Sequence, residues 1–175
     1  DRRSLAVKVA QLAAASVPLG QGDHLVSEAF YLTDPDGNGL ELYRDRPEDE
    51  WPREADGSVR MASDPVDIEG LFAEINGTPP ADPAAPAGTK LGHVHLKVAD
   101  VAAAEQFYAG VLGFDVMARW AGALFVSAGG YHHHLGMNTW ESRGGLPAGV
   151  HETGLREFSL ILPDRAELAR VTERV

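Results

Sequence analysis

The stretch "LGHVHLKVADVAAAEQFYAGVLGFDV", residues 91–116, decides the fold. Polar and apolar side chains alternate over residues 92–98, which is typical of a half-buried strand. Residues 101–113 place apolar side chains at helical spacing and end on Gly113, a residue type that commonly ends helices. The residues from Phe114 onward alternate again. This stretch therefore predicts a strand, a helix and a second strand in that order.

Two further strands are expected directly after this unit. The second strand of the unit is FDVMARW, which ends at Trp120. The two further strands are GALFVSAGG and YHHHLGMNTW, which end at Gly130 and Trp140, and all three segments have the β-branched and aromatic content of strands. After a loop with several glycines, LREFSLILPD (155–164) reads as another strand, and RAELARVTERV (165–175) begins a helix. The order β-α-β-β-β, followed by the start of a second such module, predicts an α+β fold with curved mixed sheets.

The N-terminal region has the signals of a helix followed by a hairpin. Residues 4–17 have helical apolar spacing and end before a Pro-Leu-Gly sequence. The segment SEAFYLTD (27–34) reads as a strand, DPDGNG as a turn, and LELYRD (40–45) as the returning strand. This arrangement resembles the end of a module whose beginning lies before Asp1.

The region 47–89 is rich in proline and acidic residues and contains one short apolar-periodic piece, DIEGLFAEI. We predict a linker with a short helix here. The domain prediction is therefore 1–46 as the C-terminal part of a first domain, 47–89 as the linker, and 90–175 as a second domain with one complete module and the start of the next.

An apparent internal repeat supports this division. The sequence DRRSLA at residues 1–6 is similar to DRAELA at residues 164–169. The chain thus begins just after the position that the strand LREFSLIL occupies in the later module. It ends just before the position that the hairpin SEAFYLTDPDGNGLELY occupies in the earlier module. We expect the sequence to be the middle of a longer protein with two domains and four paired modules.

Composition excludes several classes of function. The absence of cysteine removes disulfide frameworks and thiolate metal sites, and it fits a reducing cytoplasm. The formal charge of −11, with few and scattered basic residues, argues against nucleic acid as a partner. No apolar run is long enough for a membrane span, so no membrane association is expected.

Histidines on two predicted strands form the candidate site. Strand alternation puts His93 and His95 on one face of their strand. In the other strand it puts His132 and His134 on one face and His133 on the opposite one, so the two strands could bring two or more imidazoles together. Neutral imidazole is a good ligand for Fe, Zn, Mn, Ni or Cu. The alternative is that each histidine is an ordinary hydrogen-bonded residue of its strand.

Carboxylates that could complete a metal site are few. Glu157 is the acid within the predicted strand LREFSLIL, and Glu41 lies in the earlier hairpin with Tyr43 on its face. An acid among apolar neighbours is either paired, at a sheet edge, or a ligand. The sequence leaves these readings open.

Taken together, these segments resemble the vicinal oxygen chelate superfamily, which contains glyoxalases, bleomycin resistance proteins and extradiol ring-cleaving dioxygenases. Residues 91–116 resemble the opening of one of its βαβββ modules, and "DPDGNGLELY" resembles the closing hairpin of another. The segment "ALFVSAGGYHHHLGMNTW" is most similar to the bacterial catechol 2,3-dioxygenase branch. The resemblance implies paired modules that form a cup around a divalent metal.

The resemblance also implies a ligand set. His93 matches the first-strand ligand, His134 matches the fourth-strand position with His132 in reserve, and Glu157 stands where many extradiol enzymes have histidine. The carboxylate that these enzymes take from their last hairpin would lie beyond Val175, or would be supplied by Glu41. Fe(II) is the expected metal, with Mn(II), Zn(II) or Ni(II) as alternatives.

The function implied is oxygen-dependent cleavage of a catechol-type ring in aromatic catabolism, by an enzyme that acts in the cytoplasm. The sequence leaves the oligomeric state open, with a homo-oligomer as one option. His95, His133 and Tyr131 are candidate acid–base or substrate-bonding groups, and Asn138 and Trp140 are candidate substrate contacts. Two alternatives remain, because one fold supports several functions. They are a glyoxalase-type isomerase or transferase and a metal-free drug-binding protein.

Overall fold

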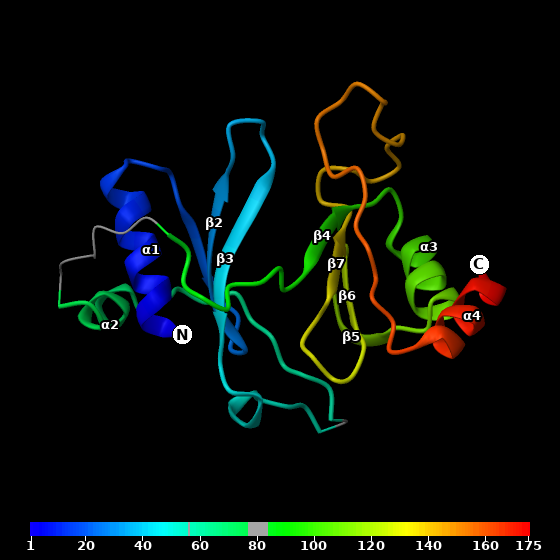
Figure 1. Cartoon of the computed structure of the whole chain (residues 1–175), viewed down its shortest axis with the longest axis horizontal. Coiled ribbons are helices and arrows are strands. Elements are labelled where there is room, and N and C mark those ends of the chain that lie inside the picture. Colours follow the sequence, from blue (N-terminus) through cyan, green and yellow to red (C-terminus); the bar gives the residue numbers. More distant parts are fainter. Residues whose placement is uncertain (56, 77–83) are drawn as a thin grey trace. The chain divides into compact units, whose positions relative to one another are not determined.

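The computed structural model describes residues 1–55, 57–76 and 84–175, and its chain forms two compact units. The first unit contains Asp1–Lys90 and the second contains Leu91–Val175. Figure 1 labels the helices and strands of each. The mixed α+β class with curved sheets is confirmed.

The first unit is a small antiparallel sheet with helices. Its elements are α1 (Arg2–Ala14), β1 (Gly20–Asp23), β2 (Ser27–Thr33), β3 (Gly39–Asp45), the 3₁₀ turn η1 (Glu48–Glu50) and α2 (Ile68–Ala73). The strand order is β1-β2-β3, and both pairs are antiparallel. The predicted helix and hairpin are confirmed. Strand β1 was missed because its sequence, GQGD, has no residue type that favours strands.

The core of the first unit combines α1, β2 and the region after η1. Its buried members are Leu5, Ala6, Val9, Phe30, Val66, Leu71 and Ile75. Much of the proline-rich region thus packs onto the first unit, where α2 covers α1 (Figure 1). The indole N–H of Trp51 also donates to the carbonyl of Arg46 at 2.9 Å. The predicted domain boundaries stay a prediction.

A buried carboxylate connects three elements of this unit. Glu28 in β2 is 2% exposed and accepts hydrogen bonds from Arg2 of α1 and Arg44 of β3 at 3.0 and 2.8 Å. Burial by itself would raise the pKa of Glu28, but the hydrogen bonds and charges of the two guanidinium groups hold it below its usual value. Glu28 is therefore an ionised, fully paired group within the unit.

The second unit has the predicted β-α-β-β-β order. Its elements are β4 (Val94–Lys97), α3 (Val101–Glu105), its π-helical continuation η2 (Gln106–Val111), β5 (Asp115–Trp120), β6 (Ala123–Ser127), β7 (Leu135–Asn138) and α4 (Arg165–Arg174). The strand order is β4-β7-β6-β5, in which β4 and β7 are parallel and the other pairs are antiparallel. As predicted, the helix ends at a glycine in the left-handed region, Gly113, with φ of 88°.

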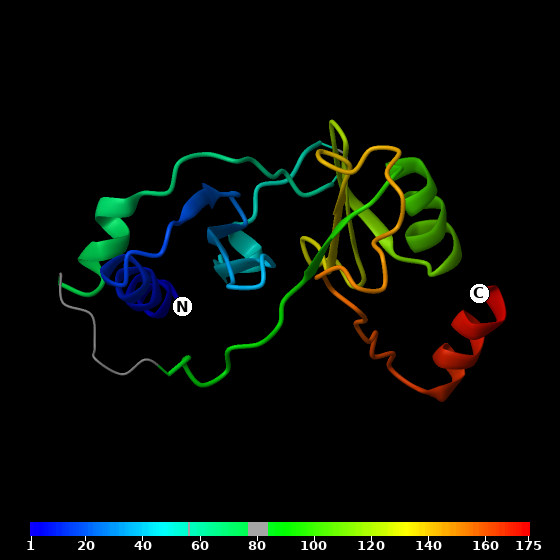
Figure 2. The ribbon, with the colours of Figure 1, turned by 90° about the horizontal axis from the view of Figure 1, so that it is seen from above.

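This sheet has one face toward α3 and one face away from it, as Figure 2 shows from above. The face toward α3 carries the apolar core, whose buried members are Ala104, Leu124, Val126, Leu135 and Met137. On the other face, His95, Gly136 and Phe125 are neighbours across β4, β7 and β6. The predicted alternation of β4 thus directs its histidine away from the core.

Two predicted strands differ in the structure. Residues 155–164, expected to form a strand, contain neither strand nor helix, and Ile161 is 96% exposed. The reason is that a strand needs a partner for its backbone groups, and no described residue pairs with this segment. The strand predicted over residues 131–140 is also shorter, because His132 and His133 lie in the loop before β7.

The internal repeat has a structural counterpart. Asp1 caps α1 by accepting a hydrogen bond from the backbone N–H of Ser4 at 2.7 Å. Asp164 caps α4 in the same way, accepting from the N–H of Glu167 at 2.8 Å. Each aspartate satisfies a backbone donor at the start of its helix.

In the described parts of the chain, no helix is both long and apolar enough to cross a lipid bilayer.

Candidate active site

The site face is built by the parallel pairing of β4 with β7. Val94 pairs with Leu135, so the residues just before the two strands also become neighbours. The N–H of Val94 donates to the carbonyl of His134 at 3.0 Å, which extends the contact by one residue. Consecutive glycines with positive φ, Gly129 and Gly130, turn the chain before it enters this loop. The histidine triplet is therefore held beside His93.

His93 lies against two members of the triplet. Its ring centroid is 4.3 Å from that of His133 and 6.5 Å from that of His132. The Nδ1 atoms of His132 and His133 are 2.9 Å apart. In a hydrogen bond between these two nitrogens, one must donate and the other must accept. His132 is buried, whereas His133 is half-buried with Phe125 5.0 Å away.

The third member of the triplet has different neighbours. The Nδ1 atom of His134 lies 2.9 Å from the hydroxyl of Ser127 and 3.3 Å from the backbone nitrogen of Ala128. Its ring lies 5.0 Å from that of Tyr131, and Tyr131 also packs on His132 at 4.1 Å. Tyr131 thus covers the loop, and His134 is anchored to the end of β6.

His95 forms a second polar group on the same face. Its Nε2 atom lies 2.7 Å from the Nδ2 atom of Asn138, which is buried at the end of β7. Trp140 follows, 59% exposed, with its ring centroid 6.2 Å from that of His95. The indole N–H of Trp140 donates to the carbonyl of Ala121 at 3.2 Å. The exposed indole of Trp140 thus lies beside the exposed ring of His95.

The two candidate carboxylates lie on other segments of the chain. Glu157 is exposed in the segment without secondary structure. Glu41 lies in β3 of the first unit, where the phenol of Tyr31 donates to it at 3.2 Å. Tyr31 also contacts His24, whose Nε2 atom is 2.5 Å from the phenol oxygen. Burial, together with the charge and hydrogen bond of Glu41, raises the pKa of Tyr31.

The structure therefore brings His93, His132 and His133 together and pairs His95 with Asn138. Within residues 1–55, 57–76 and 84–175, no three His, Asp or Glu side chains are arranged to hold a metal ion by themselves. The ligand and catalytic assignments made from the sequence stay predictions. Three residues of this face were not singled out from the sequence, namely Phe125, Ser127 and Gly136. The alternation along β6 could have identified Phe125 and Ser127, since the two side chains lie on the same face of that strand.

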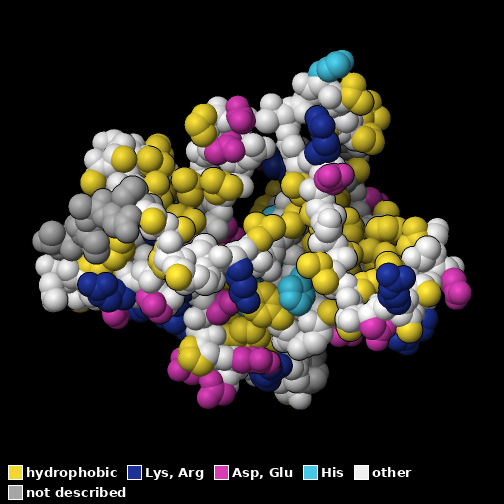
Figure 3. All heavy atoms as spheres, viewed as in Figure 1, with side chains coloured by type: hydrophobic (Ala, Val, Ile, Leu, Met, Phe, Trp, Pro, Cys, Tyr) yellow, Lys and Arg dark blue, Asp and Glu magenta, His cyan; other side chains and the backbone are white. Residues whose placement is uncertain are grey.

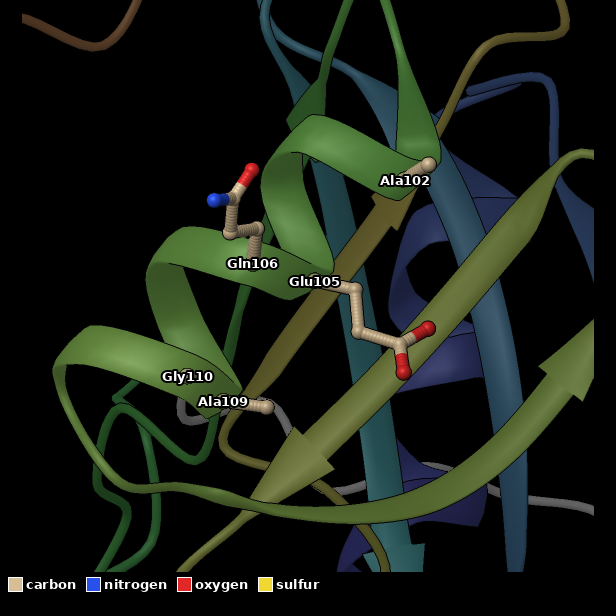
Figure 4. A pocket seen from close by; sticks show the side chains of 5 residues that line it. All are labelled: Ala102, Glu105, Gln106, Ala109 and Gly110. Carbon is tan, nitrogen blue, oxygen red and sulfur yellow. The ribbon is translucent and has the colours of Figure 1, made fainter.

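A surface hollow lies on the helix side of the second unit. It has a volume of about 600 Å³ and is lined by Ala102, Glu105, Gln106, Ala109 and Gly110, which Figure 4 labels. These residues belong to α3 and η2, whereas the histidines lie on the sheet face directed away from that helix. The hollow therefore plays no part in the candidate site.

Figure 3 shows acidic side chains scattered over the visible surface, without one dominant patch.

The module topology and the histidine-bearing face define a class of protein. Residues 90–175 match the model of the Glyoxalase/Bleomycin resistance protein/Dioxygenase superfamily, so this part of the chain is similar to members of that superfamily.

A particular relative covers the whole chain. The chain is 46% identical over 177 residues to the protein named catechol-2,3-dioxygenase from Bacillus subtilis (strain 168). The match includes 100% of this chain and 61% of the length of that relative.

A solved structure also matches. It is 2,2',3-trihydroxybiphenyl 1,2-dioxygenase from dibenzofuran-degrading Sphingomonas wittichii strain RW1, with 19% identity over 76% of this chain and 42% of that chain. The TM-score is 0.25, which is too low to carry an argument about the site.

Proposed function

We propose that the protein is an extradiol dioxygenase that cleaves the ring of a catechol-type aromatic with O2. The observation that carries this proposal is the packing of His133 against His93, at 4.3 Å between centroids, on the sheet face directed away from α3. The catechol-2,3-dioxygenase with which the chain is 46% identical supports it. Because the chain spans 61% of that relative, the activity of the whole protein is part of the proposal.

The imidazoles around His93 have the donor chemistry that suits a first-row metal ion such as Fe(II), with Mn(II), Zn(II) or Ni(II) as alternatives. His93 is half-buried beside other imidazoles, and neutral imidazole is a preferred donor for these ions. We propose His93 as a ligand, with His134 and Glu157 as further ligands. When bound, Fe(II) would hold both catechol oxygens and allow electrons to pass from the ring to O2.

The protein groups around this position would orient the substrate and move its proton. We propose that His133 takes a proton from a catechol hydroxyl and later returns it, because imidazole exchanges protons near neutral pH and this ring lies beside His93. The coupled Nδ1 contact with His132 gives that proton a second nitrogen within 2.9 Å. Phe125 and Tyr131 would exclude water from one side of the site.

The proposal also covers the domain organisation, the location and the oligomeric state of the protein. We propose that residues 1–46 close a first domain and that residues 90–175 belong to a second, with the region 47–89 between them. The packing of Val66, Leu71 and Ile75 assigns part of that region to the first unit. We also propose a cytoplasmic location, for which the absence of cysteine is the supporting observation, and a homo-oligomeric state.

One experiment tests the function directly. The full-length protein is purified without oxygen, loaded with Fe(II), and examined for iron content and for O2 uptake with catechol. The proposal expects about one iron per chain and about one O2 consumed per catechol cleaved. The variant His93→Ala should lose both, whereas His151→Ala, which alters an exposed loop histidine, should keep both. No bound metal and no O2 uptake in the unaltered protein would contradict the proposal.

A further inference from the structure

A backbone N–H two residues further along the chain determines the orientation of the side-chain amide of Asn138. The side chain is buried, with 7% exposure, at the end of β7. Its Oδ1 atom accepts a hydrogen bond from the backbone N–H of Trp140 at 3.2 Å. A backbone N–H can only donate, so the amide oxygen must face Trp140. The amide NH₂ group consequently faces the other way.

That NH₂ group is directed at a ring nitrogen of His95. The Nδ2 atom of Asn138 lies 2.7 Å from the Nε2 atom of His95. An amide NH₂ has hydrogens to donate and no lone pair to accept with, so Nε2 of His95 must be the acceptor. A neutral His95 then carries its proton on Nδ1. A proton on Nε2 would face the hydrogens of the amide.

The ring of His95 lies over Gly136 and beside two aromatic rings. A Cβ atom at Gly136 would lie 2.8 Å from Nδ1 of His95, so the ring occupies space that only glycine leaves open. Phe125 lies on one side, with centroids 6.1 Å apart and planes at 80°, and Trp140 lies at 6.2 Å. His95 is nevertheless exposed on the face that carries His93.

We propose that Asn138 is a positioning residue that holds His95 in the Nδ1–H form, and that His95 donates this hydrogen to an oxygen of the aromatic substrate. The inference rests on the proposed function for the identity of the substrate, a catechol or its anion. It replaces the expectation that Asn138 itself contacts substrate, since both ends of its amide are engaged by the protein. An oxygen that bears negative charge would strengthen such a hydrogen bond.

The tautomer can be measured without metal, substrate or activity. The 175-residue chain is prepared with ¹⁵N-labelled histidine, and couplings between ring protons and nitrogens identify which nitrogen is protonated. The variant His95→Gln assigns the His95 signals by their loss. The structure predicts Nδ1–H for His95 in the unaltered chain. A proton on Nε2 instead would overturn the proposal.

A pair of variants tests the role of Asn138. In Asn138→Asp the carboxylate can only accept, so the proton of His95 should move to Nε2. In Asn138→Gln an amide remains, and a return of the Nδ1–H form would be rescue by the conservative change. Should Asn138→Asp leave the proton on Nδ1, Asn138 does not control the tautomer. Histidine signals outside this site, such as those of His151, should not change in either variant.

Kinetics of the Fe(II)-loaded full-length protein test the donation to substrate. His95→Gln and Asn138→Asp should each raise KM for catechol by about tenfold, the size expected for the loss of one hydrogen bond. Unchanged KM in both variants would overturn the donation to substrate, while the measured tautomer would still stand. If the unaltered protein consumes no O2 with catechol, the proposed function fails and the substrate part of this inference fails with it. The NMR result separates that case from an error about Asn138.

Discussion

His133 packs against His93 with ring centroids 4.3 Å apart and an angle of 50° between the planes. One ring precedes β4 and the other lies in the loop before β7, so the contact exists because these two strands pair in parallel. Residues that are forty positions apart in the sequence, counted from 93 to 133, thus become neighbours on one face. We predict that the two rings have separate functions, in which His93 binds the metal and His133 transfers the proton of the substrate.

His93→Ala should weaken Fe(II) binding by about tenfold or more, because the variant removes a proposed ligand. Titration of the anaerobic protein with Fe(II) or Co(II) measures this change. His151→Ala supplies the matched control at an exposed loop position. Equal metal affinity in the two variants would remove His93 from the ligand set.

His133→Gln should lower kcat by about 10² to 10⁴-fold with iron content unchanged, because it removes a proton-transfer group and keeps a polar side chain of similar reach. Single-turnover O2 uptake and iron analysis on the same sample separate chemistry from metal loss. An iron content that falls together with kcat would instead make His133 a ligand.

Glu28→Gln should reduce the free energy of unfolding by about 3–5 kcal/mol, because two arginines lose the charge that faces them within the protein. Urea unfolding followed by far-ultraviolet circular dichroism gives the value. Glu69→Gln is the control, since Glu69 is exposed on α2 and its change should cost less than about 0.5 kcal/mol. Similar losses in both variants would mean that the Glu28 ion pairs contribute little.

The same glutamate should make stability depend on acidity. The folded-state pKa of Glu28 lies below the ordinary value of 4.5, so its contribution is fully present above about pH 4.5 and is lost as the pH falls through the folded pKa. The unaltered chain should therefore lose stability more steeply than Glu28→Gln below pH 4.5. Urea midpoints measured at several pH values test this slope. Parallel curves would show that other carboxylates, such as Asp23, account for the acid sensitivity.

Gly136→Ala should destabilise the second unit by about 1–3 kcal/mol, because the added Cβ would lie 2.8 Å from Nδ1 of His95. Combination with His95→Ala should restore most of that loss, since the clashing ring is then absent. Gly154→Ala is the control at an open position with no atom within 4 Å. Thermal unfolding of the four variants measures the coupling, and strictly additive losses would show that the ring is not the obstacle.

The sequence by itself determined the local elements. Alternation in residues 92–98 placed His95 on the face opposite the core, and helical spacing with Gly113 defined α3 and its end. These features depend on neighbours within a few residues. The aspartate caps of α1 and α4 are local in the same way, which is why the repeat was visible in the sequence. The catechol-type function was reached through family resemblance rather than through geometry.

Only the tertiary structure decided which histidines meet. Periodicity put His132 and His134 on one face of a continuous strand, but the ladder covers only Leu135–Asn138, and His133 reaches His93 from the loop. Pairing of β4 with β7, the space left by Gly136 and the anchoring of His134 to Ser127 are long-range relations. The strand predicted over 155–164 shows the same limit, because a strand forms only where partner backbone groups are present. The period of a sequence gives the direction of a side chain, whereas the partner that it meets depends on how distant segments pair.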